Sequence, residues 1–539
     1  MSQGIVCAPQ PEAVEAGVLA LEQGGNAVDA AIACALVQTA IDPQMCGIAG
    51  FGSMHLYLPN QGQHHFIDFH GRAPAATKED MWEDIVISET EDGFGFVLEG
   101  GVNDLGYQSI TSPGSIKAFA EAIERYGNLT LAALLEPAIE YCEQGFAVRT
   151  HVASYWNLVE EAGRIAHIQR LKAIPATAKI YTKEDGSIYK AGEILRNPDM
   201  GNTYRRIASA GVEDFYQGAI ASKIVADMKD NGGLLSGDDL RDFQTEQREP
   251  VWGEFHGYEV ATNPLPGGGA MVIEMLNILS HFDLKAMGHN STRYIATVAE
   301  AMKIATVDKD MHMGDPRYVD VPLNVLLSAE HAEKMATRIR NGEKTSVPRL
   351  NSGADNKDTT HVCAVDGMGN CVSMTHSLGN PSGVVTEGLG FMYNGCMNVF
   401  DPRPGRSNSL APGKSRFTAM SPTIVFKNKR PYLVIGAPGG TYITMGVLQG
   451  ILNCLVFGMN AQETVAGPRF CVTSDVIDVT NRIPRYIQSE LESLGYQVRR
   501  SHQSFGFAGV HAIRINEQGW DGGADPGRDG MSLQTRPKS

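Results

Sequence analysis

An abrupt change in residue composition and pattern near residue 358 constrains the fold more than any other feature of this sequence. Residues 351–358 read NSGADNKD, a polar stretch in which alanine is the one apolar residue. Directly afterwards His361–Val365 alternates as a strand does, Gly367–Asn370 is typical of a turn, and Cys371–Thr375 predicts the returning strand. A polar linker therefore leads into a hairpin, and we predict the main boundary of the chain immediately before Thr359.

Helical patterns lie on both sides of this boundary. Pro11–Gln23 places apolar residues on one helical face, and Asn26 is expected to cap a second, alanine-rich helix over Ala27–Thr39. Residues 115–335 are mostly helical in pattern, and a second hairpin over 422–436 precedes another helix. Helices that surround antiparallel strands predict an α+β layered fold.

Composition excludes several classes of protein. The chain has 539 residues and a net charge of −16, which argues against nucleic acid as a partner because such binders need a basic surface. No window approaches the roughly 18 unbroken apolar residues that cross a bilayer, and no secretory signal is visible, so we expect no membrane association. The nine cysteines form no CxxC pair, which favours reduced thiols and a cytoplasmic protein. Familiar metal and nucleotide motifs are absent, so we expect neither a metal nor an organic cofactor.

The segment Asp358-Thr359-Thr360-His361 is where chemistry is expected. A threonine hydroxyl is a poor nucleophile unless a base lies beside it. If the bond before Thr359 is cut, the new α-amino group has an unperturbed pKa of about 8 and lies within reach of the hydroxyl. One residue then supplies both nucleophile and base. The alternative is that the two threonines merely begin a strand, for which their β-branched side chains are suited.

Several segments together resemble the γ-glutamyltranspeptidase family of N-terminal nucleophile hydrolases. They are TTHVCAVDGMGNCVSMTHS, AMSPTIVF, GAPGGTYITMGVLQ, GGADPGRDG and GGNAVDAAIACAL, and the resemblance extends from about Gly4 to Gly530. It implies a precursor that cuts itself between Asp358 and Thr359. The two products, residues 1–358 and 359–539, are then expected to stay intertwined as one unit, a four-layer αββα sandwich.

The resemblance also implies roles for individual residues. Thr359 matches the nucleophile, and Ser377 matches a hydroxyl residue that hydrogen-bonds to it. Gly439 and Gly440 match a glycine pair whose backbone N–H groups form the oxyanion hole. Glycine suits that position because it has no Cβ to block a tetrahedral intermediate.

The loop that usually holds a substrate carboxylate departs from the family pattern. The family has an arginine in an RExAP loop, whereas this chain has His70 at the aligned place and Arg72 two residues later. We expect Arg72 to anchor the carboxylate; the alternative is that Arg72 is a surface residue. Thr418 and Ala419 replace the usual serine pair and are expected to line the substrate site.

The residues that usually bind an α-ammonium group are also replaced. Gly379 stands where the family has asparagine, and Cys396 and Val399 stand where glutamine and aspartate are usual. A buried ammonium without a carboxylate partner would bind poorly. The resemblance thus predicts that the catalytic chemistry is retained while glutamate recognition is lost.

These observations predict an autoprocessed amidohydrolase that hydrolyses a small, carboxylate-bearing amide such as oxamate through an acyl-enzyme. Such an activity belongs to purine-nitrogen metabolism. Two alternatives stay open: a γ-glutamyl hydrolase or transpeptidase acting on glutathione-type amides, and an inactive family member that serves as a binding protein. The expected partners are the amide substrate and the two chains of the cleaved precursor, with a homodimer or a dimer of αβ heterodimers as the assembly.

Overall fold

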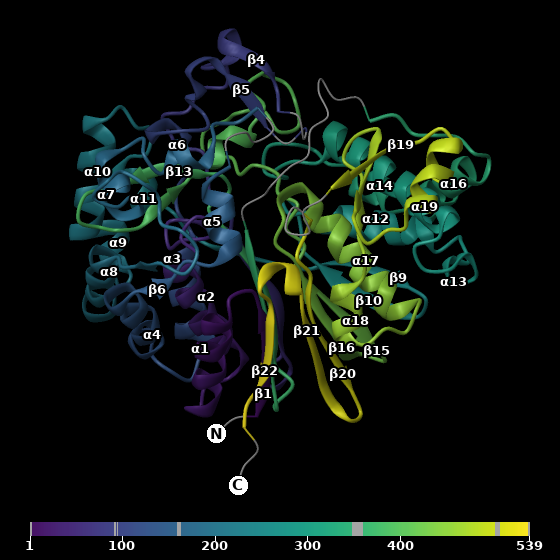
Figure 1. Cartoon of the computed structure of the whole chain (residues 1–539), viewed down its shortest axis with the longest axis horizontal. Helices are drawn as coiled ribbons and strands as arrows, with labels where there is room; N and C mark the ends of the chain where they lie inside the picture. Colours follow the sequence, from purple (N-terminus) through teal and green to yellow (C-terminus); the bar gives the residue numbers. More distant parts are fainter. Residues whose placement is uncertain are drawn as a thin grey trace.

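The protein is described by a computed structural model that covers residues 3–90, 93, 95–158, 163–347, 359–501 and 507–536. The linker 351–358, and with it Asp358, lies outside the described residues. Among the described residues, two large antiparallel sheets face each other near the centre of the molecule, and most helices lie to either side of them (Figure 1).

The first sheet contains the strands that surround Thr359. Its order is β22-β1-β11-β12-β2-β3-β8, with every neighbouring pair antiparallel. The bounds are β1 Gly4–Ala8, β2 Phe51–Leu58, β3 Gln63–Phe69, β8 Glu246–Arg248, β11 Thr360–Asp366, β12 Cys371–Ser377 and β22 Met531–Gln534. The hairpin predicted after the linker is confirmed as β11 and β12, which lie in the interior of this sheet.

The second sheet has the order β21-β20-β16-β15-β10-β9. Its strands are β9 Val251–Phe255, β10 Tyr258–Thr262, β15 Thr423–Lys427, β16 Arg430–Gly436, β20 His511–Asn516 and β21 Gly519–Ala524. The predicted second hairpin is confirmed as β15 and β16. Between the sheets lies a compact apolar cluster to which both contribute, including Cys363 from β11 and Val434 from β16.

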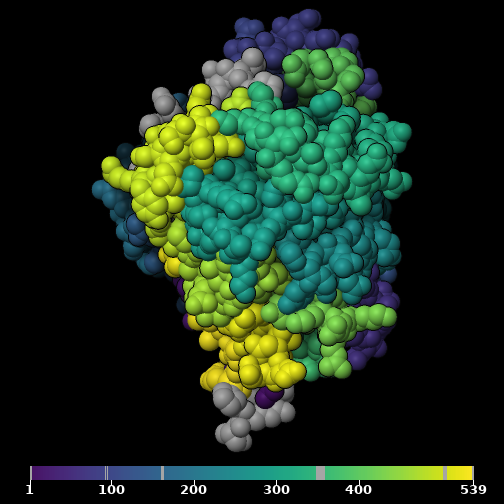
Figure 2. Space-filling view, turned by 90° about the vertical axis from the view of Figure 1, so that its right-hand side faces the viewer, coloured from purple at the N-terminus to yellow at the C-terminus, as the bar shows by residue number. Residues whose placement is uncertain are grey.

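Helices cover the outer faces of both sheets. α1 (Pro11–Glu22) and α2 (Ala27–Ile41) pack against β1, β11 and β12, whereas α12 (Gly269–Leu279) and α17 (Ile443–Leu455) pack against the second sheet. The predicted cap of α2 is confirmed, because the Asn26 side chain accepts hydrogen bonds from the N–H groups of Val28 and Asp29. Figure 2 looks onto the second helical layer and shows teal residues from the middle of the chain beside yellow C-terminal residues.

The α+β prediction is therefore confirmed at the level of mixed helices and sheets. No helix in the described ranges has both the length and the apolar character needed to cross a membrane.

A polar cluster around the buried Glu274 joins three helices of the second layer. His331 of α16 (Ala329–Arg340) places its Nε2 atom 3.1 Å from Oε1 of Glu274 on α12. The same nitrogen lies 3.3 Å from Oδ2 of Asp308 on α14 (Thr292–His312). Burial raises the pKa of Glu274 to about 8. Hydrogen bonds to Asp308 and Glu274 raise the pKa of His331 to about 9.

We predict that this cluster makes the protein less stable as the pH rises. Both groups bind protons more tightly in the folded chain, so the stability contributed by His331 is complete below 6.5 and is lost as the pH rises through about 9. That of Glu274 is complete below 4.5 and is lost through about 8. Denaturant unfolding between about pH 7 and 9 should give a steeper loss in wild type than in a Glu274→Gln, His331→Gln double variant. Buried thiols act in the same direction in both proteins, so equal slopes would contradict the prediction.

Candidate active site

The site is built where β11 begins and β12 ends. Thr360 pairs with His376 across the two strands, which places Thr359 opposite Ser377. Thr359 Oγ1 donates a hydrogen bond to Ser377 Oγ over 3.3 Å. The Ser377 hydroxyl also accepts a 2.8 Å hydrogen bond from the backbone N–H of Gly379. Both hydroxyl residues are buried, so the structure brings together the two hydroxyl groups that the sequence predicted to meet.

The neighbouring threonine faces the opposite layer. Gln38 of α2 donates from Nε2 to Thr360 Oγ1 over 2.9 Å, and its Oε1 lies 2.9 Å from Nε2 of His376. Burial lowers the pKa of His376 to about 3, so the ring is neutral and donates its Nε2 proton to Gln38. Because successive strand side chains point to opposite faces, Thr359 is turned away from the α2 layer. Gln38 thus fixes which of the two threonines faces the site.

A close contact between the two sheets brings Gly439 and Gly440 near Thr359. A side chain on Gly436, the last residue of β16, would overlap the ring of His361 on β11. This close approach brings the segment after β16 to the start of β11. Gly439 then adopts φ +136°, and a Cβ there would lie 2.6 Å from Cα of Ala508. Gly440 opens a short 3-10 turn that runs into α17, so the electropositive N-terminal end of that helix faces the site.

A pocket of about 460 Å³ lies between these elements. Five residues predicted from the sequence line it: Thr359, Ser377, Thr418, Ala419 and Gly440. Its remaining walls come from Phe51, Arg164, Gly379, Asn380, Asn398, Val399, Arg416, Met420 and Ile443. Gly439 adjoins Gly440 but is not itself a lining residue.

Arg416 is the buried cation of this pocket that sequence reasoning missed. It is 5% exposed, and its guanidinium lies over the ring of Phe51 at 4.8 Å. Nη1 donates to the Phe417 carbonyl over 3.3 Å, and Nη2 lies 3.8 Å from the Cys396 thiol. A Cβ on Gly379 would stand 3.0 Å from Nη2 and 3.1 Å from that thiol. The small residues at 379 and 396 therefore leave the space that the guanidinium occupies.

Cys396 is placed behind this guanidinium and does not line the pocket, although the sequence predicted it as a substrate-binding residue. Arg416 stands two residues before Thr418. This short separation in the sequence is the feature from which the place of Arg416 in the pocket could have been predicted.

A buried ion pair supports another part of the pocket wall. Asp104 Oδ2 lies 2.6 Å from Nη2 of the fully buried Arg170. The other oxygen of Asp104 accepts from the side-chain amides of Asn398 at 3.0 Å and Asn380 at 3.4 Å. Burial opposes ionisation, but Arg170 and these hydrogen bonds hold the pKa of Asp104 below its ordinary value. The pair thus fixes two amide side chains that line the pocket.

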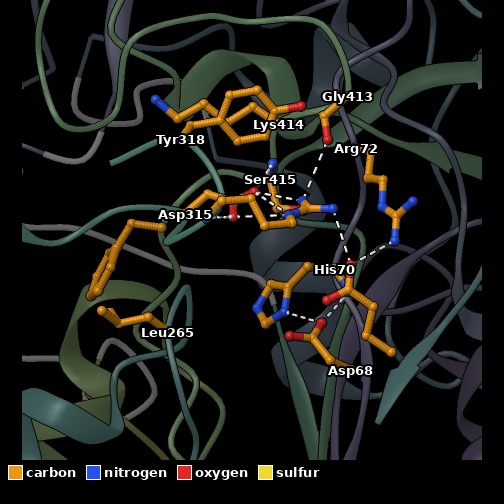
Figure 3. A network of polar contacts seen from close by, with 12 residues as sticks. Asp68, His70, Arg72, Leu265, Asp315, Tyr318, Gly413, Lys414 and Ser415 are labelled. Atoms are coloured by element: carbon orange, nitrogen blue, oxygen red, sulfur yellow. Dashed lines mark hydrogen bonds and ion pairs between the residues drawn. The ribbon is translucent and has the colours of Figure 1, made fainter. Parts of the chain in front are cut away.

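Arg72 does not line the pocket, although the sequence predicted that it anchors the substrate carboxylate. Its Nη2 is 2.8 Å from Oε1 of Glu246 and donates to the Gln244 carbonyl over 3.1 Å. The guanidinium also lies over the Phe243 ring at 5.5 Å. Figure 3 shows Arg72 directed into this neighbouring network, apart from the His70 ring. The acidic and aromatic partners at 243–246 hold the side chain there.

His70 takes the place beside the pocket instead. Its Nδ1 lies 2.7 Å from Oδ1 of Asp68, and its Nε2 lies 2.8 Å from the hydroxyl of Thr418 (Figure 3 shows the His70–Asp68 contact). All three residues are buried. The sequence marked His70 as the residue in place of an arginine, and it indicated no role for Asp68.

Potential metal ligands gather elsewhere. Among the described residues, the one group of three or more such side chains is Glu274, Asp308 and His331, whose ligand atoms lie within 4.8 Å of one another. None of them lines the pocket. The nine cysteines are buried and no disulfide joins them.

Comparison with known proteins identifies the family. Residues 13–535 match the family described as gamma-glutamyltranspeptidase. The chain is 35% identical to the acylase ACY 1 proenzyme of Pseudomonas sp. (strain V22), over 96% of this chain and 91% of that protein. It is 32% identical to the glutathione hydrolase proenzyme of Escherichia coli (strain K12), over 87% and 80% respectively. The solved structure of a cephalosporin acylase from Bacillus halodurans superimposes with a TM-score of 0.88 at 29% identity, covering 100% of this chain and 96% of that one.

The chain therefore belongs to the gamma-glutamyltranspeptidase family and is a hydrolase of the N-terminal nucleophile type.

We predict that Ser377→Ala lowers the rate of amide hydrolysis. The change removes the acceptor for the Thr359 hydroxyl, and loss of one positioned hydrogen bond at a reacting centre costs roughly 10- to 1,000-fold in kcat. Ser377→Thr retains the hydroxyl and should keep most of the activity. Steady-state kinetics, with circular dichroism as a check on folding, measures the effect. An unchanged kcat in the alanine variant would make Ser377 only a strand residue.

Proposed function

We propose that the chain is a precursor that cuts itself between Asp358 and Thr359, leaving residues 1–358 and 359–539 as two chains. Thr359 then acts as an N-terminal nucleophile that hydrolyses a small amide carrying a carboxylate. The names of several relatives include the word proenzyme, which supports the maturation step. The position of Thr359 at the start of a buried strand, beside the Ser377 hydroxyl, supports its role.

The chemistry needs little besides Thr359 and the backbone around it. The Thr359 hydroxyl attacks the amide carbonyl while its own α-amino group, with an ordinary pKa of about 8, takes the proton. The N–H groups of Gly439 and Gly440 hold the negative charge that develops on the carbonyl oxygen. The amino group returns the proton to the departing amine, and water then releases the acyl group from Thr359.

The observation that carries the substrate class is the guanidinium of Arg416 in the Thr359 pocket. A buried cation favours an anionic group, and guanidinium donors match a carboxylate. The guanidinium occupies space left by Gly379 and Cys396. The family resemblance implies residues for an α-ammonium group at these positions. The site therefore attracts a carboxylate at the place where a γ-glutamyl substrate would bring a positive charge.

The acyl group is the part that the family name leaves open, because relatives carry both acylase and glutathione hydrolase names. Oxamate is the smallest amide acid of the proposed class, and its hydrolysis would place the protein in purine-nitrogen metabolism. We also propose the four-layer αββα sandwich of N-terminal nucleophile hydrolases, supported by helices packed on both sheets. The buried thiols support a cytoplasmic location.

We predict that Thr359→Ala stays a single chain of 58.2 kDa and is inactive. Alanine has no hydroxyl to attack the carbonyl of the preceding residue or that of a substrate. Thr359→Ser keeps both functional groups and should mature slowly with some turnover. Intact-mass spectrometry after incubation provides the measurement. An alanine variant that still splits at this bond would overturn the assignment of Thr359, and a wild-type chain that never splits would favour an inactive binding protein.

We predict that wild type prefers a glutaryl anilide over the matched γ-glutamyl anilide, which differs by one α-ammonium group. Repulsion from buried Arg416 should disfavour the γ-glutamyl compound by about 10-fold or more in kcat/KM. Arg416→Met removes this charge but keeps an unbranched side chain, so it should raise KM for the glutaryl compound and reduce the preference, while Arg164 still lines the pocket.

Arg72→Met is the matched control, because Arg72 lies outside the pocket and pairs with Glu246. It should leave the preference intact. A wild-type preference for the γ-glutamyl anilide would replace the proposed function with that of a γ-glutamyl hydrolase or transpeptidase. The same assays with oxamate and longer amide acids would then define the acyl length.

A further inference from the structure

We infer that Asp68 and His70 fix the direction of the Thr418 hydroxyl, so that the pocket accepts a hydrogen bond from the substrate next to its carboxylate. Asp68 and His70 are positioning residues in this arrangement, and Thr418 is the residue that touches substrate. The inference rests on the proposed function and adds a second recognition element to Arg416.

The hydrogen bonds around Asp68 determine the tautomer of the imidazole. Asp68 Oδ1 accepts from the backbone N–H of His70 at 2.9 Å and contacts His70 Nδ1 at 2.7 Å. Although burial works in the opposite direction, the contacts with His70 and the charge of Arg248 hold the pKa of Asp68 below its ordinary value. The group is therefore a carboxylate, which can only accept, so the Nδ1 atom must carry a proton.

The other ring nitrogen then faces Thr418. His70 Nε2 and Thr418 Oγ1 are 2.8 Å apart. The rings of His70 and Phe51 lie 6.0 Å apart, and the guanidinium of Arg416 lies 4.8 Å from the same Phe51 ring. In the neutral form Nε2 has a lone pair and accepts the Thr418 proton.

A hydroxyl has one proton and two lone pairs. With its proton committed to His70, Thr418 offers only acceptor capacity to the pocket that it lines. A substrate group that donates an N–H or O–H bond is therefore favoured, and a group that can only accept is not. This is the opposite polarity to that of Arg416, which only donates.

The spacing of Arg416 and Thr418 limits where the donor lies on the substrate. Two residues of chain span at most about 7 Å, and both side chains line one pocket. We therefore place the donor group of the substrate near its carboxylate. The proposed ligand class is thus an amide acid with a hydroxyl or N–H adjacent to its carboxylate.

Histidine tautomers give a test that needs no substrate. Selective 15N-histidine labelling of the mature protein, with the His70 signals assigned by their loss in His70→Gln, should show a protonated Nδ1 and an unprotonated Nε2. In Asp68→Asn the amide can accept from the backbone N–H and donate to Nδ1, so the tautomer should reverse. An imidazolium, or an Nε2-protonated ring, in wild type would overturn the inference.

Substrate selectivity gives the functional test. Three malonamates with hydroxyl, methoxy or methyl at C2 share the carboxylate and the amide, and differ in what they offer Thr418. Wild type should favour the hydroxyl compound over the methoxy compound by about 10-fold in kcat/KM, the scale of one buried hydrogen bond. Thr418→Val should bring the ratio to about one, and Thr418→Ser should keep it. Asp68→Asn should also bring the ratio to about one, because Thr418 would then donate into the pocket and both the hydroxyl and the methoxy oxygen can accept.

Arg72→Met serves again as the control that leaves the ratio unchanged. Failure of the inference is distinct from failure of the proposed function. If no amide acid is hydrolysed, the proposed function is wrong while the tautomer measurement still decides the state of His70. If amide acids are hydrolysed and the hydroxyl-to-methoxy ratio is equal in wild type, Thr418→Val and Asp68→Asn, the inference is wrong while the proposed function stands.

Discussion

The antiparallel pairing of β11 with β12 is the interaction on which the site depends. Its register sets Thr359 opposite Ser377, and the alternation along β11 turns Thr360 toward α2 and Thr359 away from it. A shift by one residue would exchange the two threonines and place the wrong hydroxyl in the pocket. The buried contacts of Gln38 with this strand pair specify that register from the helical side.

The positive charge in the pocket depends on the small side chains next to it. Gly379 and Cys396 leave room for the Arg416 guanidinium, while Glu246 neutralises Arg72 outside the Thr359 pocket. The family resemblance implies a positive charge in the loop after β3, whereas the buried guanidinium of this pocket comes from the segment before β15. Thr359 retains its hydrogen bond to the Ser377 hydroxyl.

Local patterns predicted much of this arrangement, and contacts distant in sequence account for what was missed. The hairpin after the linker and the Asn26 cap depend on neighbouring residues, so periodicity and capping rules suffice for them. The direction of the Arg72 side chain depends on Glu246, which is 174 residues away. Likewise, His70 meets Thr418 across 348 residues. No spacing rule relates such pairs, and a single chain offers no covariation from which to detect them.

The strand order of the first sheet has a mechanical consequence for a chain cut before Thr359. In the order β22-β1-β11-β12-β2-β3-β8, the pairs β22–β1, β1–β11 and β12–β2 would each join one fragment to the other. In the second sheet β15–β10 would do the same. Strands of each fragment would be hydrogen-bonded to strands of the other. Separating the fragments would therefore require breaking backbone hydrogen bonds in both sheets. Dilution alone would not separate such a pair. The two fragments would unfold together, and neither would exchange as a free subunit.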